Sequence, residues 1–293
     1  MRIACLPWYD LPETRPAQDA LWRVLARHLR RNGLRDVPRR LSRCSSVFRL
    51  LCDPNLLLGQ CCGYDVIYGM SSNLWPVATP RYAAPGCTGA DYRSLVLVRN
   101  DSDAAELRDL RRKVCVVNGF ASHSGTNALR ALVAPLSRDG RFFRHVLISG
   151  GHLASLAQLR MGAADVMAID CVLFALLLRH RPHVVEGTRV LCSSPPAPAP
   201  PLVASSQAGR SEVRRIRNAL AGALEDPAGR DAAAELLLHG FEELPLPSYA
   251  RIVELEAAAL RHGYFELHAT TPAVRPAVRF RAASQDDEME VRP

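Results

Sequence analysis

The sequence has little of what marks membrane, disulfide-rich or metal-binding proteins. No apolar run reaches the roughly 18 residues of a membrane-spanning helix, because the longest candidate, residues 163–178, contains Asp165 and Asp170. The nine cysteines are odd in number and include no C-x-x-C pair, so they predict neither a disulfide framework nor a metal site. Most of them lie in apolar runs, where a reduced cysteine packs as a small hydrophobe. We therefore expect no cofactor, no bound metal and no insertion into a membrane.

Lysine is almost absent too, since Lys113 is the only one among 37 basic residues. The formal net charge is +8, but the arginines are scattered along helical patterns. The densest group, between Arg23 and Arg43, falls on one amphipathic helix and its exit and has no interleaved aromatic residues. This pattern is typical of a solvated helix surface, and we predict no nucleic-acid partner.

The start of the chain also has no apolar core long enough for a signal peptide, because Pro7 interrupts it. We expect the chain as given to be cytoplasmic, and periplasmic only if the true start lies upstream. Its 293 residues, 48% of them hydrophobic, are enough for one large or two medium domains.

Strand-length apolar runs alternate with helical patterns, which is typical of the α/β class. In the first part we expect a strand at 3–6, helices at 17–32 and 54–60, a helix or short strand at 47–52, a strand at 65–70 and a Pro- and Gly-rich break at 76–89. In the middle we expect strands at 94–99, 114–117, 145–149 and 166–169, with helices at 101–109, 125–136, 152–161 and 171–180. Helices at 211–224, 229–238 and 249–261 follow the Pro-rich segment 192–205, whose prolines predict an extended chain.

This order predicts two lobes joined by two hinge crossovers. Residues 1–93 and 200–268 would form lobe one, residues 94–199 would form lobe two, and residues 269–293 would be a disordered tail. Ligands of open α/β sheets bind at the carboxyl ends of strands. We therefore expect a cleft between the lobes, lined by the loops that follow the strands.

One of these loops has the composition of an anion site. Residues 118–127 follow a buried strand and begin a helix, whose first N–H groups have no partner within the helix. Ser122, Ser124 and Thr126 add hydroxyl groups, and Gly125 lets the backbone approach a ligand. The alternative is that Ser124 or Thr126 only caps the helix. A second loop of this kind, Ser-Gly-Gly-His, spans residues 149–152.

Other candidates stand near the expected cleft. Trp8 and Tyr9 either stack on a ligand or seal the lobe interface, and Asp10 either accepts a hydrogen bond from a ligand or caps a turn. Asp170 ends an apolar strand and either caps the next helix or binds a ligand cation. For Cys61 and Cys62 we favour packing over reactivity, and Ser193 and Ser194 bind either ligand or hinge.

Five phrases together resemble the phosphate, phosphite and phosphonate substrate-binding proteins of ABC transporters. They are Ile-Ala-Cys-Leu-Pro-Trp-Tyr-Asp at 3–10, Leu-Gly-Gln-Cys-Cys-Gly-Tyr at 58–64, Ser-His-Ser-Gly-Thr-Asn at 122–127, Ser-Gly-Gly-His-Leu-Ala-Ser-Leu at 149–156 and Gly-Ala-Ala-Asp-Val-Met-Ala-Ile-Asp at 162–170. The resemblance spans about residues 1–265 in matching order. It implies the two-lobed type 2 periplasmic binding protein fold, with a mixed sheet flanked by helices in each lobe.

The resemblance also implies which residues grip the ligand. In that family a Ser-Thr-Ser-Gly loop binds the phosphonate oxygens, and Ser122, Ser124 and Gly125 match it, while His152 matches a histidine in the next loop. Tyr64 resembles another cleft position of the family. The chain departs from the family at His123, which stands where the family has its threonine, so we expect ligand identity to be decided there. His123 and His152 would make binding pH-sensitive.

The leading hypothesis is therefore a non-enzymatic protein that binds a small anionic ligand between closing lobes. Its partner would be the permease of an ABC transporter or a signalling protein. The alternatives are an enzyme on the same fold, similar to thiamine-pyrimidine-precursor synthases or menaquinone-pathway lyases, and an intracellular ligand sensor. No acid/base pair stands at a recognisable spacing, so no catalytic residue is predicted.

Overall fold

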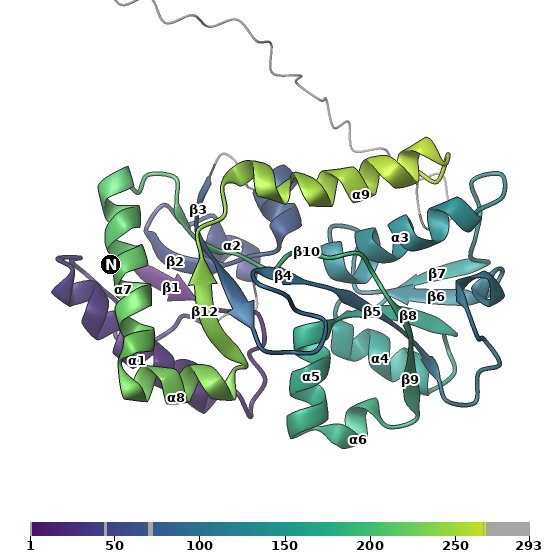
Figure 1. Ribbon diagram of the computed structural model, residues 1–293, viewed down its shortest axis with the longest axis horizontal. Helices are drawn as coiled ribbons and strands as arrows, with labels where there is room; N and C mark the ends of the chain where they lie inside the picture. The colour runs from purple at the N-terminus through teal and green to yellow at the C-terminus, as the bar shows by residue number, and fades with distance from the viewer. Residues whose placement is uncertain (1, 44–45, 70–72, 266, 268–293) are drawn as a thin grey trace, which may run out of the picture.

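The chain folds into two lobes that lie side by side along its longest axis (Figure 1). The computed structural model describes residues 2–43, 46–69, 73–265 and 267, so the tail predicted at 269–293 lies outside the described residues. Each lobe is built around a five-stranded sheet that contains both parallel and antiparallel pairs. This confirms the predicted α/β architecture of two mixed sheets flanked by helices.

The sheet of lobe one has the order β1-β2-β11-β3-β12. Its strands are β1 (Ile3–Cys5), β2 (Leu56–Gln60), β3 (Leu74–Tyr82), β11 (Leu202–Ser205) and β12 (Leu238–Glu242). The surrounding helices are α1 (Arg15–Arg31), α2 (Val47–Leu51), α7 (Arg210–Glu225) and α8 (Pro227–Glu235). Only β1 and β2 are parallel, and the other neighbours run antiparallel.

The sheet of lobe two has the order β7-β6-β8-β5-β9. Its strands are β5 (Ser94–Arg99), β6 (Val114–Val117), β7 (His145–Ile148), β8 (Val166–Asp170) and β9 (Thr188–Ser193). The helices are α3 (Ala128–Val133), α4 (His152–Arg160), α5 (Cys171–His180) and α6 (Pro182–Val185). Strands β7, β6 and β8 are parallel, so the loops that follow them emerge at one edge of the sheet.

The two crossovers between the lobes pair with each other. Strand β4 (Asp91–Tyr92) and strand β10 (Ala197–Pro198) form a separate two-stranded antiparallel sheet between the lobes (Figure 1). The Pro-rich segment is extended, as its prolines predict, but it belongs to β9, β10 and β11 in turn.

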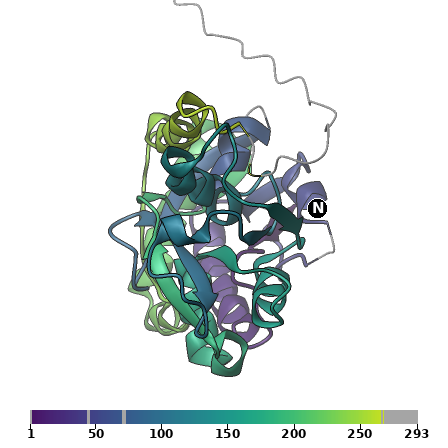
Figure 2. The ribbon, with the colours of Figure 1, turned by 90° about the vertical axis from the view of Figure 1, so that its right-hand side faces the viewer.

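Helix α9 (Ala250–Arg261) passes over both lobes, along the top of Figure 1, and Figure 2 shows it above lobe two. The core of lobe two includes Ala259, Tyr264 and Leu267, although this part of the chain was assigned to lobe one from the sequence. Directly before α9, the hydroxyl of Tyr249 is hydrogen-bonded to the hydroxyl of Thr79 of β3 in lobe one. Helix α9 and the residues that flank it therefore contact both lobes instead of belonging to lobe one alone.

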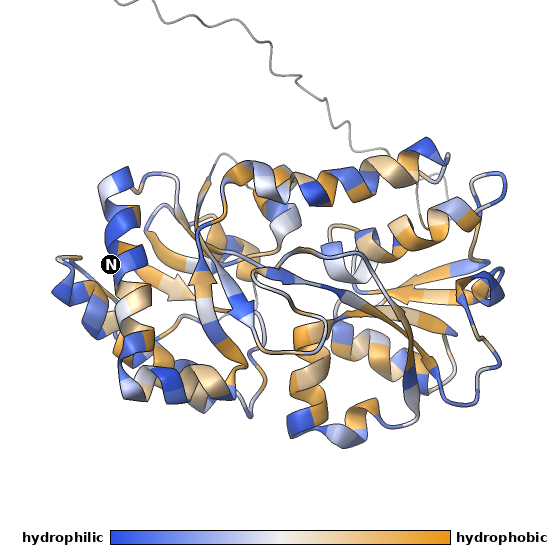
Figure 3. Cartoon of the chain, viewed as in Figure 1, coloured by the Kyte–Doolittle hydropathy of each residue, from blue (hydrophilic) through white to orange (hydrophobic). Residues whose placement is uncertain are grey.

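Burial explains which elements form. The strands in the interior of both sheets are apolar, whereas the helices turn hydrophilic faces outward (Figure 3). In β2, β6 and β8 almost every residue is buried, as expected for strands covered by helices on both sides of a sheet. Among the described residues, no helix combines the length and apolar character needed to cross a membrane.

Three local predictions were wrong. Residues 54–60 form β2 instead of a helix, because burial in the sheet outweighs the helix preference of three leucines. Residues 65–69 form a short helix instead of a strand. The expected break at 76–89 is in part β3, which includes Pro76 and Pro80 although proline cannot donate a ladder hydrogen bond. Strand β12 was not predicted, and only its first residue, Leu238, falls in the helix expected at 229–238.

Candidate functional site

A cleft of about 820 Å³ lies between the two lobes. Lobe one contributes residues 7–11, Val47, Cys62 and Asp65. Lobe two contributes Asn118, Ser149 and Asp170, with their neighbours, from the loops that follow β6, β7 and β8. These loops meet because the three strands are parallel, so their carboxyl ends lie at one edge. The cleft is therefore where the topology of an α/β sheet places a ligand.

The loop after β6 turns back on itself through side-chain hydrogen bonds. Ser122 caps the five-residue π-helical turn His123–Asn127, since its Oγ accepts from the N–H of Gly125 at 3.1 Å. Thr126 Oγ1 donates to the carbonyl oxygen of Gly119 at 2.5 Å. The sequence suggested Ser124 or Thr126 as the helix cap, but the capping residue in the structure is Ser122. Thr126 serves the loop itself.

Ser124 and His152 join the two glycine-containing loops. Ser124 Oγ lies 3.0 Å from Nε2 of His152, and both residues line the cleft. Burial lowers the pKa of His152 to about 4, so its ring is neutral at neutral pH. The backbone of Ala168 opposes part of this shift, and Nδ1 of His152 has no hydrogen-bond partner among the described residues. Ser124 also bonds to the hydroxyl of Tyr92, another cleft residue.

Asp170 links the lobes at the cleft. Its Oδ1 caps α5 by accepting from the N–H groups of Val172 at 2.7 Å and Leu173 at 3.0 Å. Its Oδ2 accepts from the hydroxyl of Tyr9 in lobe one at 2.8 Å. Burial raises the pKa of Asp170 to about 6, and these three donors oppose the rise. Of the two roles considered from the sequence, capping is present, together with an interlobe bond.

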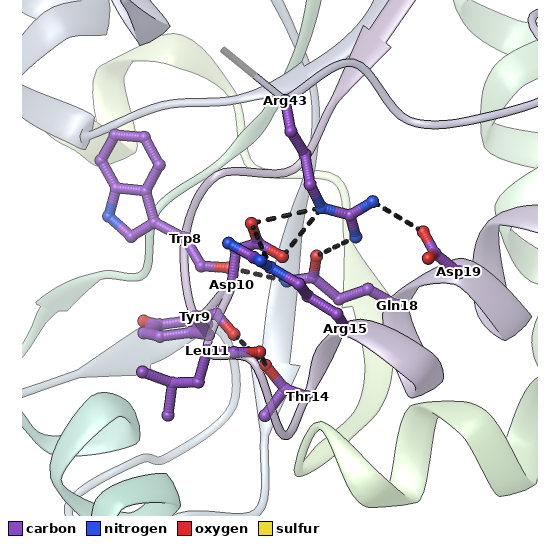
Figure 4. Close-up of polar contacts among 9 residues, drawn as sticks. All are labelled: Trp8, Tyr9, Asp10, Leu11, Thr14, Arg15, Gln18, Asp19 and Arg43. Carbon is purple, nitrogen blue, oxygen red and sulfur yellow. Dashed lines mark hydrogen bonds and ion pairs between the residues drawn. The ribbon is translucent and has the colours of Figure 1, made fainter. Parts of the chain in front are cut away.

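The loop after β1 is tied down around the cleft residues Trp8 to Leu11 (Figure 4). Thr14 Oγ1 donates to the carbonyl oxygens of Tyr9 and Leu11. Gln18 donates to the carbonyl oxygen of Trp8 at 3.2 Å. These bonds stabilise a backbone in which Tyr9 has a φ of 63°, a value that costs energy in a non-glycine residue. These hydrogen bonds therefore fix the conformation of the loop after β1.

Asp10 lies at the rim of the cleft but faces arginines. Its carboxylate accepts from Nε of Arg43 at 3.0 Å and from Nε of Arg15 at 3.3 Å (Figure 4). Arg43 also bonds to Asp19 at 2.9 Å. Asp10 is therefore an ion-pair partner of lobe one rather than the turn cap considered from the sequence.

His123 does not line the cleft, although the sequence led us to expect its ring there as the residue that decides ligand identity. The side chain of His123 is 2% exposed, and its Nδ1 lies 3.3 Å from the side-chain nitrogen Nδ2 of Asn127. The ring packs against Tyr92 with a centroid separation of 6.1 Å. Burial lowers its pKa to about 4. The imidazole of His123 therefore packs beneath the loop, against Asn127 and Tyr92.

Three further candidates also lie outside the cleft wall. Tyr64 donates to Glu256 of α9 at 3.1 Å and packs on Tyr68, 4.7 Å between ring centroids. Thr126 faces Gly119, and Gly125 packs beneath Asn118 and His152. In contrast, Trp8, Tyr9, Ser122, Ser124, His152 and Asp170 all line the cleft, as predicted. Ser194 lies in the return crossover and bonds to the N–H of Ser94, so it serves the hinge.

Asn118, Tyr92, Cys62 and Asp65 line the cleft but were not singled out as ligand-binding residues from the sequence. Asn118 follows β6 directly, a position that could have identified it, and its buried Oδ1 has no hydrogen-bond partner among the described residues. Tyr92 belongs to the first crossover, and nothing local identifies it. Cys62 had been expected to pack in the core, and Asp65 began an expected strand. Burial raises the pKa of Cys62 to about 11, which keeps its thiol protonated at neutral pH, and it also raises the pKa of Asp65.

The charge of the cleft wall is unusual for an anion site. Asp10, Asp65 and Asp170 line it, whereas no arginine or lysine does among the described residues. In the same part of the chain, no group of three histidine, cysteine or acidic side chains could hold a metal ion. An anion here would be bound by hydroxyl, amide and backbone N–H donors.

Several solved structures share this fold. A binding protein component of an ABC phosphonate transporter from Pseudomonas aeruginosa has a TM-score of 0.70 and 15% identity, covering 90% of this chain and 88% of its own. PhnD1 from Prochlorococcus marinus, in complex with methylphosphonate, has a TM-score of 0.67 and 14% identity, with 88% and 97% covered. A Xanthomonas citri protein bound to chloride ion has a TM-score of 0.67 and 18% identity, with 89% and 98% covered.

The sequence itself carries the family assignment. No curated protein sequence matches the chain. A family model described as ABC transporter, phosphonate, periplasmic substrate-binding protein matches residues 64–248, which is more than half of the chain. The match includes the loops after β6, β7 and β8 that line the cleft. The chain therefore belongs to the family of periplasmic substrate-binding proteins of phosphonate ABC transporters.

Proposed function

We propose that the chain binds a small phosphonate- or phosphate-like anion in the cleft between its lobes and delivers it to the permease of an ABC transporter. The observation that carries the proposal is the gathering of Ser122, Ser124, His152 and Asn118 on one wall of the cleft. These residues come from two loops that follow neighbouring parallel strands. They supply hydroxyl, imidazole and amide groups of the kind that bind oxyanions.

The start of α4 adds backbone hydrogen-bond donors to the same wall of the cleft. The helix begins at His152 after Gly151, and no side chain caps it. The first N–H groups of a helix have no partner within the helix and carry a partial positive charge. Leu153 and Ala154, in this first turn, line the cleft. An anion bound beside His152 would accept hydrogen bonds from these backbone N–H groups, which have no acceptor within the helix.

The acidic residues narrow the kind of ligand. Asp170 is already bound by three donors, and Asp10 is paired with Arg43 and Arg15. Asp65 accepts from the N–H of Cys62 at 3.1 Å and faces the cleft from the opposite lobe. A ligand with an anionic group toward lobe two and a hydrogen-bond donor toward Asp65 would suit both walls.

A thermal-shift titration with phosphate, phosphite, methylphosphonate and longer alkylphosphonates tests this function. A ligand at a hundred times its dissociation constant stabilises the folded protein by about 2.7 kcal/mol, which raises the melting temperature measurably. We expect at least one of these anions to raise it, and sulfonates of the same shape to raise it less. The proposal is overturned if none of the anions changes the melting temperature.

Variants locate the binding site within the molecule. Ser124→Ala and His152→Ala each remove a group of the cleft wall, and we expect each to weaken binding by about 1–3 kcal/mol. Ser137→Ala is the matched control, because that hydroxyl donates to the carbonyl oxygen of Ala134, away from the cleft. Equal affinity in all three variants would show that the anion binds elsewhere.

A further inference from the structure

Two cysteines from distant parts of the sequence lie in contact beside the cleft. Cys87 Sγ and Cys171 Sγ are 3.6 Å apart. Cys87 belongs to the segment that leads from β3 of lobe one into the first crossover, and Cys171 is the first residue of α5 in lobe two. Neither Cys87 nor Cys171 is part of a disulfide.

Backbone hydrogen bonds position both thiols. A turn places Cys87, whose N–H donates to the carbonyl oxygen of Ala84 at 3.0 Å. The next residue, Thr88, forms an isolated bridge with Asp91. On the other side, Cys171 donates its N–H to the carbonyl oxygen of Arg93 at 3.0 Å, and its Sγ accepts from the N–H of Arg93 at 3.5 Å. The contact therefore does not depend on one flexible side chain.

Gly86 lets the two segments come this close. A Cβ atom at residue 86 would lie 3.3 Å from both Cβ and Sγ of Cys171, and its φ of +99° disfavours other residue types. The loop thus passes directly over the start of α5. A side chain at residue 86 would crowd Cys171, so the glycine permits the contact between Cys87 and Cys171.

We propose that Cys87 and Cys171 form a reversible disulfide that ties the segment entering the first crossover to the start of α5. In a disulfide the sulfur atoms are about 2.05 Å apart, so the two thiols must approach by about 1.5 Å. The proposal is independent of the ligand of the cleft. It assigns these two residues as a site of covalent modification.

A small-molecule disulfide such as oxidised glutathione is the oxidant. The thiolate of the half-exposed Cys87 attacks one glutathione sulfur, forms a mixed disulfide and releases one reduced glutathione. The thiolate of Cys171 then attacks the Cys87 sulfur and releases the second. The two protein thiols are oxidised by two electrons, and glutathione disulfide takes up those electrons and both protons.

The order of attack follows from the environments of the two thiols. Cys171 is buried and bonds to Cys87, and both effects raise the pKa of its thiol. A thiol of raised pKa ionises poorly, so it is the weaker first nucleophile. It becomes effective once Cys87 carries glutathione, because the attacked sulfur is then held beside it. Cys87 therefore captures the oxidant, and Cys171 resolves the mixed disulfide.

The bond would form next to a contact that joins the lobes. Asp170, which accepts from Tyr9 of lobe one, immediately precedes Cys171. The first crossover, β4, begins four residues after Cys87. A disulfide here would fix the approach to this crossover against lobe two, so the oxidised protein would unfold at a higher temperature than the reduced one.

Oxidation of the full chain with oxidised glutathione, followed by mass spectrometry without reduction, tests the proposal. We expect the wild-type protein to lose two hydrogen atoms and to yield one peptide pair linked through Cys87 and Cys171. Cys87→Ser and Cys171→Ser should not form this link. Cys192→Ser, which alters a half-buried cysteine of β9 outside the pair, should form it as the wild type does.

Melting temperatures provide a second readout on the same samples. Oxidation should raise the melting temperature of the wild type and of Cys192→Ser, and dithiothreitol should reverse the rise. The proposal is overturned if the wild-type peptides show Cys87 and Cys171 unlinked after oxidation, or if either is linked to another cysteine instead. It also fails if Cys87→Ser shows the same rise as the wild type.

Discussion

Gly125 lies under the cleft loop where two functional side chains meet. A Cβ atom at this position would come within 1.8 Å of Oδ1 of Asn118 and 3.1 Å of Cε1 of His152. Real Cβ atoms do not make a contact as close as the first, so any side chain at residue 125 displaces Asn118. The glycine is required here for space.

We therefore predict that Gly125→Ala destabilises the protein by about 1–3 kcal/mol, the usual effect of overpacking a well-packed site. It should also weaken ligand binding, because Asn118 and His152 both line the cleft. Chemical denaturation and the titration described above measure the two effects.

Gly119→Ala is the control for this prediction. A Cβ atom at residue 119 would meet nothing within 4 Å, although it belongs to the same loop. Its stability and affinity should match those of the wild type. Equal effects of the two substitutions would mean that the loop is sensitive to any lost glycine and that the contact with Asn118 is not the cause.

At the scale of elements, α9 connects the lobes through Glu256. The carboxylate pairs with Arg130 of α3 in lobe two at 2.9 Å. It also accepts from the hydroxyl groups of Tyr64 and Tyr68, which belong to lobe one. Burial opposes ionisation of Glu256, but these partners outweigh it and lower its pKa. Helix α9 thus carries a polar link between the two lobes.

Glu256→Gln should reduce the free energy of unfolding by about 1–3 kcal/mol, because hydrogen bonds to a charged, half-buried group are lost or weakened. Urea denaturation measures this change. Glu254→Gln on the same helix is the matched control. Glu254 pairs with Arg251, and their side chains are 62% and 46% exposed, respectively. Such exposed ion pairs contribute little to the free energy of unfolding. If the two variants lose the same stability, Glu256 does not act as an interlobe link.

At the scale of the whole molecule, buried titratable groups make stability depend on pH. Burial lowers the pKa of His123 and His152 to about 4, below the ordinary value of 6.5. Their contribution is therefore complete above pH 6.5 and is lost as the pH falls toward 4, because the unfolded chain takes up the protons first. Asp170, whose pKa is raised to about 6, acts in the opposite direction: its contribution is complete below pH 3.8 and is lost as the pH rises through 6.

The two histidine shifts together exceed the shift of Asp170, so we predict that the melting temperature falls between pH 6.5 and 4.5. Each histidine shift corresponds to about 3 kcal/mol at full effect. His123→Gln removes one of the two groups and should make the fall shallower, as differential scanning fluorimetry across this range would record. His145→Gln, at an exposed position of β7, should leave the curve unchanged. A wild-type melting temperature that rises on acidification would contradict the prediction.

The lobe-two elements were the most predictable part of the fold. Strands β5, β6 and β8 and helices α4 and α5 were expected almost to the residue, because each apolar run is bounded by polar or glycine residues that mark its ends. In lobe one the pattern failed where long-range pairing decides structure. Strand β2 resembles a helix in its leucines, and β3 contains two prolines, yet both pair with β11 from far along the chain.

The cleft residues divide in the same way. Ser122, Ser124, His152 and Asp170 were found because each stands where a strand ends or a helix begins, and such positions can be read locally. Tyr92 and Asp65 were not singled out, since the packing of whole elements brings these two side chains to the cleft wall. His123 was expected there and lies elsewhere, because the side-chain direction within a five-residue turn depends on what the turn packs against.

The sequence by itself determined the α/β class, the two lobes with their crossovers, the glycine-containing loops and the family. These follow from local periodicity, from residues that begin and end elements, and from phrases in a fixed order. Only the tertiary structure decided that α9 straps both lobes, that Tyr9 bonds to Asp170 across the cleft, and that Cys87 meets Cys171. Each of these contacts joins residues far apart in the chain, and their proximity arises from the packing of whole elements, which no local pattern encodes.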